Sequence, residues 1–123
     1  MLDLETGITA VAYTSDNIVY RREIFSSSPD QVIAVKLTAD KPGSISFTAN
    51  LRGVRNQQHS DYGTDYFRMD GLGKDGLVLT GKSADYMGVQ GKIKYEARIK
   101  AVAKGGTMHV DDANLTIENA DEV

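Results

Sequence analysis

Apolar and polar side chains alternate along most of this sequence, and this period of two constrains its fold more than any other feature. Successive side chains of a β-strand point to opposite faces, so such alternation is typical of strands that bury one face. The clearest example places Ile45, Phe47, Ala49 and Leu51 opposite serine, threonine and asparagine side chains. No segment carries an apolar stripe of helical period with capping residues, so we expect little helix.

Turn residues divide the alternating segments into seven or so short strands, as in an antiparallel β-sandwich. The strand-like segments are residues 8–14, 18–26, 31–38, 45–51, 77–80, 93–103, 108–110 and 115–118. A turn at 15–17 predicts a hairpin of the first two strands. The Pro-Gly turn at 40–43 predicts a second hairpin of 31–38 with 45–51, and the Gly-Gly turn at 104–107 predicts a third, of 93–103 with 108–110. We therefore expect an all-β chain.

Length and composition exclude several classes of protein. The 123 residues are enough for a single β-sandwich domain or a fragment of one, which we expect to span 1–123. Fourteen basic against seventeen acidic residues leave a formal charge of −3, which argues against nucleic acid as a partner. No apolar run approaches the roughly 18–20 residues of a membrane-spanning helix, so no membrane partner is expected. Because the chain has no cysteine, disulfides, thiolate zinc sites and cysteine nucleophiles are excluded.

Residues 52–76 break the alternation, and we interpret them as a long polar loop. The loop contains the candidate contact residues His59, Asp61, Tyr62, Asp65, Tyr66 and Arg68. Aromatic rings that cover sugar C–H faces, together with polar groups that bind hydroxyls, would suit a carbohydrate ligand. The alternative, which we favour, is that these aromatic side chains pack on a neighbouring domain.

Motifs that might carry chemistry lack the context they need. Residues 71–76 fit G-x-G-x-x-G, but a strand-like segment follows them where a nucleotide site needs a helix, so we predict a turn. His59 and His109 are far apart in sequence and do not have metal-ligand spacing, and we expect His109 in a strand beside Val110. Most acidic residues fall in turns, where an aspartate usually bonds backbone amides. We therefore assign no catalytic residue, cofactor-binding residue or metal ligand.

Several short motifs, in order, resemble the N-terminal β-sandwich of family 95 glycoside hydrolases, which are α-L-fucosidases and related enzymes. They are residues 2–7 (LDLETG), 11–13 (VAY), 20–25 (YRREIF), 28–33 (SPDQVI) and 40–47 (DKPGSISF). The tail at 115–123 is similar to the segment that leads into a further strand of that supersandwich-like domain. The loop at 52–76 departs from the family pattern.

The resemblance implies an N-terminal, non-catalytic part of a larger glycoside hydrolase. In that family the catalytic acid and the residues that activate water lie in a following (α/α)₆ barrel, and the reaction inverts the anomeric centre. None of that barrel is present here, so this chain alone is expected to be inactive, and its expected partner is the barrel. Relatives are commonly exported bacterial proteins, which suggests a periplasmic or extracellular parent, although this chain carries no signal peptide.

Two alternatives remain open. A free-standing carbohydrate-binding module would use the loop residues to bind fucosylated glycans. A structural domain would instead self-associate through exposed edge strands, because an unpaired edge is a template for another strand.

Overall fold

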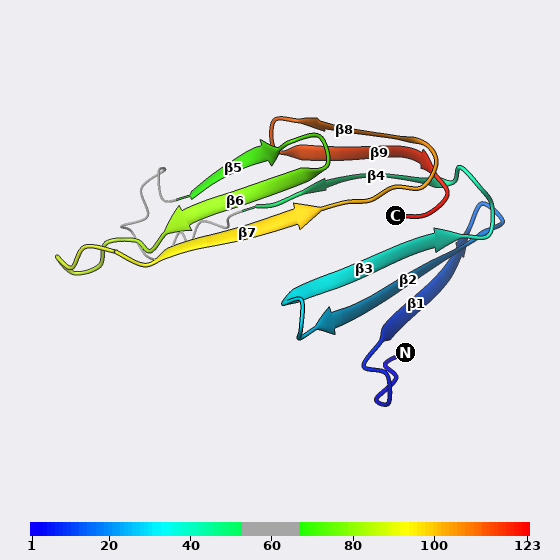
Figure 1. The fold of residues 1–123 in the computed structure, drawn as a ribbon, viewed down its shortest axis with the longest axis horizontal. Helices are drawn as coiled ribbons and strands as arrows, with labels where there is room; N and C mark the ends of the chain where they lie inside the picture. Colours follow the sequence, from blue (N-terminus) through cyan, green and yellow to red (C-terminus); the bar gives the residue numbers. More distant parts are fainter. Residues whose placement is uncertain (53–66) are drawn as a thin grey trace. The chain divides into compact units, whose positions relative to one another are not determined.

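The computed structural model describes residues 1–52 and 67–123, and its regular structure is antiparallel β-sheet. The described strands are β1 (Thr9–Ser15), β2 (Ile18–Ser27), β3 (Val32–Ala39), β4 (Ile45–Asn50), β5 (Phe67–Leu72), β6 (Gly76–Lys82), β7 (Lys94–Lys100), β8 (Thr107–Asp111) and β9 (Asn114–Ala120). They form three-stranded sheets in the orders β1-β2-β3, β4-β9-β8 and β5-β6-β7 (Figure 1). The predicted all-β sandwich class is confirmed. Within these residues, no helix has the length and apolar character to cross a membrane.

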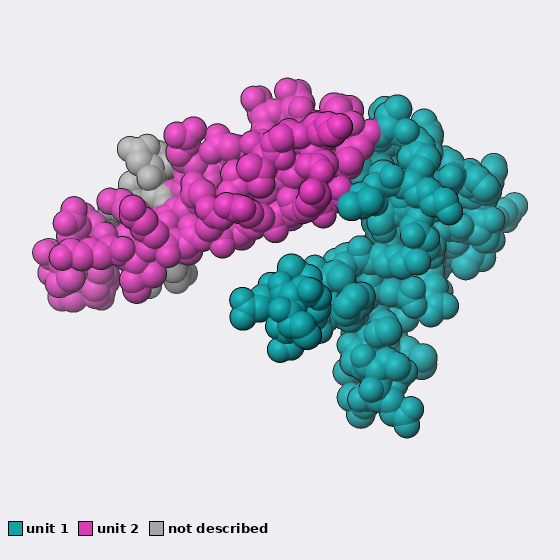
Figure 2. All heavy atoms as spheres, in the orientation of Figure 1, with its two compact units in different colours: residues 1–47, 102–107, 117–123 teal, residues 48–101, 108–116 magenta. Residues whose placement is uncertain are grey.

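The chain divides into two compact units, which are coloured separately in Figure 2. Unit 1 comprises Met1–Phe47, Val102–Thr107 and Ile117–Val123, and it contains the whole β1-β2-β3 sheet. Unit 2 comprises Thr48–Ala101 and Met108–Thr116, and it contains the β5-β6-β7 sheet. Each unit is therefore built from segments that are distant in sequence.

The first predicted hairpin is confirmed. Ser15 pairs with Ile18, so Asp16 and Asn17 form a two-residue connection between β1 and β2. Both turn residues have positive φ, 50° and 59°, which is the conformation of a type I′ turn. Asp and Asn tolerate this left-handed region better than other non-glycine residues. The local sequence therefore fixes both the turn and the register that follows from it.

The second predicted hairpin is wrong. β3 pairs with β2, beginning at Ser27 and Val32, whereas β4 lies beside β9 in another sheet. The Pro-Gly segment does turn, with Gly43 at a φ of 69°, but it carries the chain from one sheet to the next. The carboxylate of Asp121 accepts the Gly43 N–H at 2.8 Å and stabilises this corner. The bend was encoded locally, but the partner that stabilises it lies near the C-terminal end of the chain.

The third predicted hairpin is also wrong. β7 is shorter than the predicted 93–103 segment and pairs with β6, while β8 pairs with β9. Gly105 and Gly106 have positive φ, as a glycine turn requires, but they connect two sheets. A Cβ on Gly106 would clash with the carbonyl oxygen of Glu118, so close backbone approach also requires glycine here.

Part of the predicted 52–76 loop is a strand. β5 (Phe67–Leu72) pairs with β6, and the G-x-G-x-x-G segment is the turn between them, as expected from its sequence context. Phe67 and Met69 alternate with the polar Arg68 and Asp70, so a short strand-like pattern was present within the predicted loop. The earlier residues of the predicted loop, 53–66, lie outside the described part of the chain.

The buried apolar side chains are few, and none comes from β1, β2 or β3. They are Ile45, Leu77, Leu79, Ala101, Leu115, Ile117 and Ala120. β4 keeps its predicted alternation, with Ile45 buried and Ser46 exposed. Most of β7 is exposed on both faces, so the predicted burial of its alternate residues holds only towards Ile99 and Ala101.

We predict that Leu77→Ala lowers the free energy of unfolding by about 2–5 kcal/mol, because the substitution leaves a cavity at a side chain that is 1% exposed. Urea denaturation followed by far-UV circular dichroism measures the loss. Leu72→Ala, in the same sheet but 42% exposed, is the matched control and should change stability by only about 0.5 kcal/mol. Equal losses in the two variants would contradict this assignment of the core.

Candidate functional site

One face of the β1-β2-β3 sheet carries apolar and aromatic side chains from all three strands. Directly paired residues of antiparallel strands share a face, and the register pairs Tyr13 with Tyr20 and Ile24 with Val35. We call this face, with Val11, Tyr13, Tyr20, Arg22, Ile24, Ile33, Val35 and Leu37, the apolar face. Its side chains remain partly open to solvent, with Val35 52% and Ile33 73% exposed. A half-open apolar surface of this kind is typical of a contact site.

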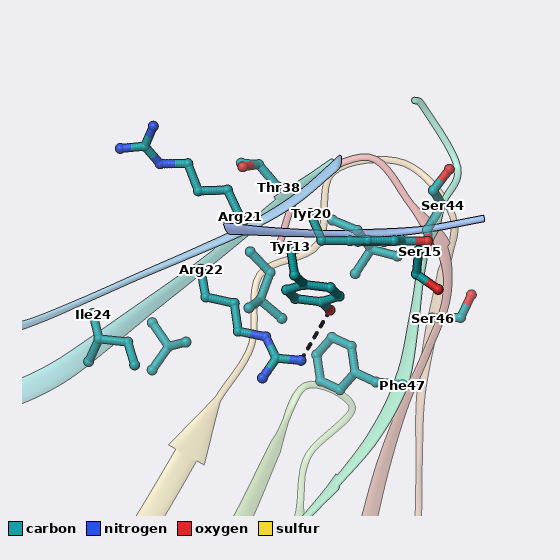
Figure 3. Close-up of a pocket in the computed structure, with 13 residues that line it drawn as sticks. Tyr13, Ser15, Tyr20, Arg21, Arg22, Ile24, Thr38, Ser44, Ser46 and Phe47 are labelled. Atoms are coloured by element: carbon teal, nitrogen blue, oxygen red, sulfur yellow. Dashed lines mark hydrogen bonds between the residues drawn. The ribbon is translucent and has the colours of Figure 1, made fainter. Parts of the chain in front are cut away.

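A groove of about 580 Å³ lies over the apolar face (Figure 3). The sheet side of the groove includes the Tyr13, Tyr20 and Arg22 side chains, and the segment 44–47 provides further lining residues. All of the lining residues belong to unit 1. The register of one sheet and the start of β4 thus build the groove together.

Polar atoms within the groove are bonded to neighbours in the same unit. The Tyr13 and Tyr20 rings stack with their centroids 5.3 Å apart, and the Arg22 guanidinium lies 5.3 Å from the Tyr13 centroid. Arg22 donates a hydrogen bond to the Tyr13 hydroxyl at 3.2 Å, shown in Figure 3 with Phe47 beside it. The Tyr20 hydroxyl donates to the Ser44 carbonyl oxygen at 3.3 Å. These contacts stabilise the sheet and its connection to β4.

Among residues 1–52 and 67–123, no carboxylate lines the groove, and the charged side chains that line it are Arg21 and Arg22. Glycoside hydrolysis by the usual route needs two carboxyl groups on either side of the scissile bond, one as acid and one as base or nucleophile. The described lining contains neither carboxyl group and presents apolar, aromatic and arginine side chains instead.

The sequence-predicted contact residues do not form this groove. His59, Asp61, Tyr62, Asp65 and Tyr66 lie outside the described residues. Arg68 lies on β5 in unit 2, is exposed, and forms an ion pair with Asp70 at 3.2 Å. An exposed pair of this kind contributes little to stability and marks no binding site by itself.

Sequence analysis missed the groove, although a signal for it was present. Tyr13 and Tyr20 are equally distant from the predicted turn at Asp16 and Asn17. A two-residue type I′ turn fixes hairpin register, so these two tyrosines had to face each other across the strands. The lining from 44–47 could not be inferred, because it required knowing that β4 leaves the first sheet.

Several described aspartates bond backbone amides. Asp40 accepts the Val19 N–H at 3.0 Å, which confirms the structural role expected for this turn residue. The pKa of Asp3 is lowered, mainly by the hydrogen bond from the Glu5 N–H and then by the Thr6 side chain. In these positions the carboxylates stabilise turns by accepting backbone N–H groups.

His109 lies in β8 beside Val110, as expected, and its side chain is exposed. Across residues 1–52 and 67–123, no three histidine, aspartate or glutamate side chains are grouped as metal ligands would be. His59 lies outside these ranges.

Comparison with known proteins identifies the type of domain. A family model described as "Glycosyl hydrolase family 65, N-terminal domain" matches residues 1–123. Alpha-L-fucosidase 2 from Arabidopsis thaliana is 52% identical to this chain over 50 residues. The matched residues make up 41% of this chain and only 6% of the fucosidase, so the match spans a small part of that relative. The predicted resemblance to the N-terminal domain of fucosidase-type glycoside hydrolases is confirmed.

We predict that Tyr20→Phe lowers the free energy of unfolding by about 0.5–1.5 kcal/mol, because it removes the hydrogen bond that joins β2 to the segment before β4. Thermal and urea denaturation measure the change. Tyr95→Phe, at a side chain that is 45% exposed in unit 2, removes the same atom and should be nearly neutral. A neutral Tyr20→Phe variant would show that the groove does not depend on this bond.

Proposed function

The chain belongs to the family of glycosyl hydrolase family 65 N-terminal domains, and from this premise we propose that it is a non-catalytic scaffold in a larger glycoside hydrolase. The parent enzyme is an α-L-fucosidase-like hydrolase whose catalytic residues lie in a separate (α/α)₆ barrel. The domain contributes a surface on which that barrel packs. The fucosidase relative supports the substrate class.

The half-open apolar face is the observation that carries this proposal. Val11, Ile24, Ile33 and Val35 are each at least 36% exposed, although they lie on one face of one sheet. Burying a side chain of this type gains about 1.5–3 kcal/mol, so contact with another part of the enzyme stabilises both partners. A sheet with an apolar face is stabilised when that face packs against another layer. The barrel supplies such a layer.

The absence of carboxylates from the groove lining supports a non-catalytic role. Asp40 and Asp121, two acids of unit 1, accept backbone N–H groups at 3.0 and 2.8 Å and so stabilise turns. These two acids therefore stabilise turns of the domain, and we assign the reaction to residues elsewhere in the enzyme.

We predict that the purified chain does not hydrolyse an aryl α-L-fucoside above the rate in buffer. A full-length α-L-fucosidase assayed in parallel at equal molarity is the positive control. Turnover that copurifies with the folded chain over two orthogonal columns would overturn the non-catalytic assignment.

A carbohydrate-binding module is the second candidate, because the Tyr13–Tyr20 pair lies in a groove that also contains serine hydroxyls. Both tyrosine hydroxyls already bond to neighbours, which favours the scaffold. We predict that calorimetric titration with fucosylated oligosaccharides gives no saturable heat. Saturable binding that is lost in Tyr13→Ala, while Tyr95→Ala retains it, would instead assign a sugar site to the groove.

A further inference from the structure

The connection from β6 to β7, residues 83–93, is ordered by its own hydrogen bonds and extends beyond the ends of both strands (Figure 1). At its base, the Ser83 N–H donates to the Ile93 carbonyl oxygen at 2.7 Å, and the Ile93 N–H donates to the Ser83 hydroxyl at 3.2 Å. At its tip, Tyr86 and Val89 exchange two backbone bonds of 2.9 Å. The β6–β7 connection is therefore a built feature of unit 2.

The large apolar and aromatic side chains of this connection are each more than half exposed. They are Tyr86, Met87, Val89 and Ile93. All four also line an open hollow of about 750 Å³, and every described lining residue of this hollow belongs to the connection itself. Exposed apolar side chains gathered on an ordered segment are typical of an interaction site.

Met87 lies where turn chemistry favours a polar residue. Met87 and Gly88 are the two central residues of the turn between Tyr86 and Val89, with φ of 47° and 80°. Asparagine followed by glycine is the preferred pair for a type I′ turn of this kind, because both residues adopt positive φ. The turn does not account for an apolar side chain here, whereas contact with an apolar partner does.

Basic side chains lie beside these apolar ones. Lys92 lines the hollow, and Lys82 and Lys94 are directly opposite each other in the β6–β7 register, although like charges at such positions repel. The one acidic residue between these two lysines is Asp85, whose carboxylate accepts the Gly91 N–H at 2.9 Å. Positive charge is thus gathered around the apolar patch, on a chain whose net charge is −3.

We propose that the β6–β7 connection is a lipid-binding element that contacts the surface of an anionic membrane. Tyr86, Met87 and Val89 enter the boundary between headgroups and acyl chains, and an acyl chain fills the hollow. Lys92 and Lys94 bind the lipid phosphates. Such an element lies in the membrane interface and needs no apolar run of spanning length, which was the criterion on which no membrane partner was expected.

Charge and shape favour a lipid surface over a protein partner. A lipid combines an anionic headgroup with an apolar chain, which matches lysines beside an apolar hollow. Two copies that met symmetrically through the connection would instead bring Lys92 and Lys94 of both copies together, and like charges would oppose that contact. The backbone groups of Tyr86 and Val89 are already paired with each other, so they offer no open edge to a strand. The proposal goes beyond the scaffold function and does not depend on it.

Co-sedimentation of the full chain with vesicles tests the proposal. The chain should bind vesicles of phosphatidylcholine that contain about one third phosphatidylglycerol, and it should bind pure phosphatidylcholine vesicles at least about fivefold more weakly. Added NaCl should weaken binding to the mixed vesicles, because salt screens the attraction of lysine to phosphate. Equal binding to both kinds of vesicle, or no binding to the mixed vesicles, would overturn the proposal.

Met87→Asn separates the side chain from the turn. Asparagine suits the turn at least as well as methionine, so urea denaturation should show no loss of stability, while affinity for mixed vesicles falls by about tenfold. Leu4→Asn removes a similarly exposed side chain from unit 1 and should bind as the parent chain does. Undiminished binding by Met87→Asn, or an equal loss in both variants, would contradict the proposal.

A second pair of variants tests the charge. Lys92→Gln should weaken binding to mixed vesicles by about fivefold. Lys74→Gln removes an exposed lysine from the turn before β6, at the opposite end of that strand, and should change binding by less than about twofold. Equal losses would show that only the overall charge of the chain matters, and the proposed site would then be wrong.

Fluorescence reports insertion directly, because the chain has no tryptophan of its own. With mixed vesicles, Val89→Trp should show a blue-shifted emission that brominated acyl chains quench. Val102→Trp, at a similarly exposed position in unit 1, should show neither effect. A shift in both variants or in neither would overturn the proposal. So would self-association without vesicles that Met87→Asn abolishes in sedimentation equilibrium, because it would assign the apolar patch to a second copy.

Discussion

The apolar face of β1, β2 and β3, whose side chains remain half exposed, is the feature that most constrains unit 1. Among residues 1–52 and 67–123, every buried apolar side chain lies on β4, β6 or β9 or just after β7, so the first sheet has no buried core residue of its own. Its order comes from the β1–β2 and β2–β3 ladders, the stacked Tyr13–Tyr20 pair and the anchors at its edges. A sheet stabilised mainly by its ladders is suited to completion by another part of a larger protein.

Apolar and acidic side chains occupy different places in unit 1. Apolar side chains and arginine line the groove, whereas acids such as Asp40 and Asp121 hold backbone amides at turns. In unit 1, these two aspartates therefore stabilise turns, and the described lining of the groove is apolar, aromatic, hydroxyl-bearing and basic.

Local chemistry predicted the strands better than it predicted their partners. The Asp16-Asn17 turn was predictable, because two residues of positive φ determine a tight hairpin and its register. Gly43 and the Gly105-Gly106 pair also turn, yet both lead into a different sheet. At Gly43 the direction of the chain depends on Asp121, which is far away in sequence but accepts the Gly43 N–H. At Gly106 the direction depends on the Glu118 backbone, which lies close to this glycine in space. A turn residue specifies a bend, while long-range contacts select the strand beyond it.

The candidate site shows the same limit. The pairing of Tyr13 with Tyr20 could be predicted from the hairpin register alone. The lining from residues 44–47 could be predicted only if the position of β4 were known. The β3 edge shows this limit again, because the Leu37 and Val123 backbone groups pair there although the two residues are distant in sequence. The alternation of β3 predicts which of its side chains share a face, but it does not predict which segment pairs with its outer edge.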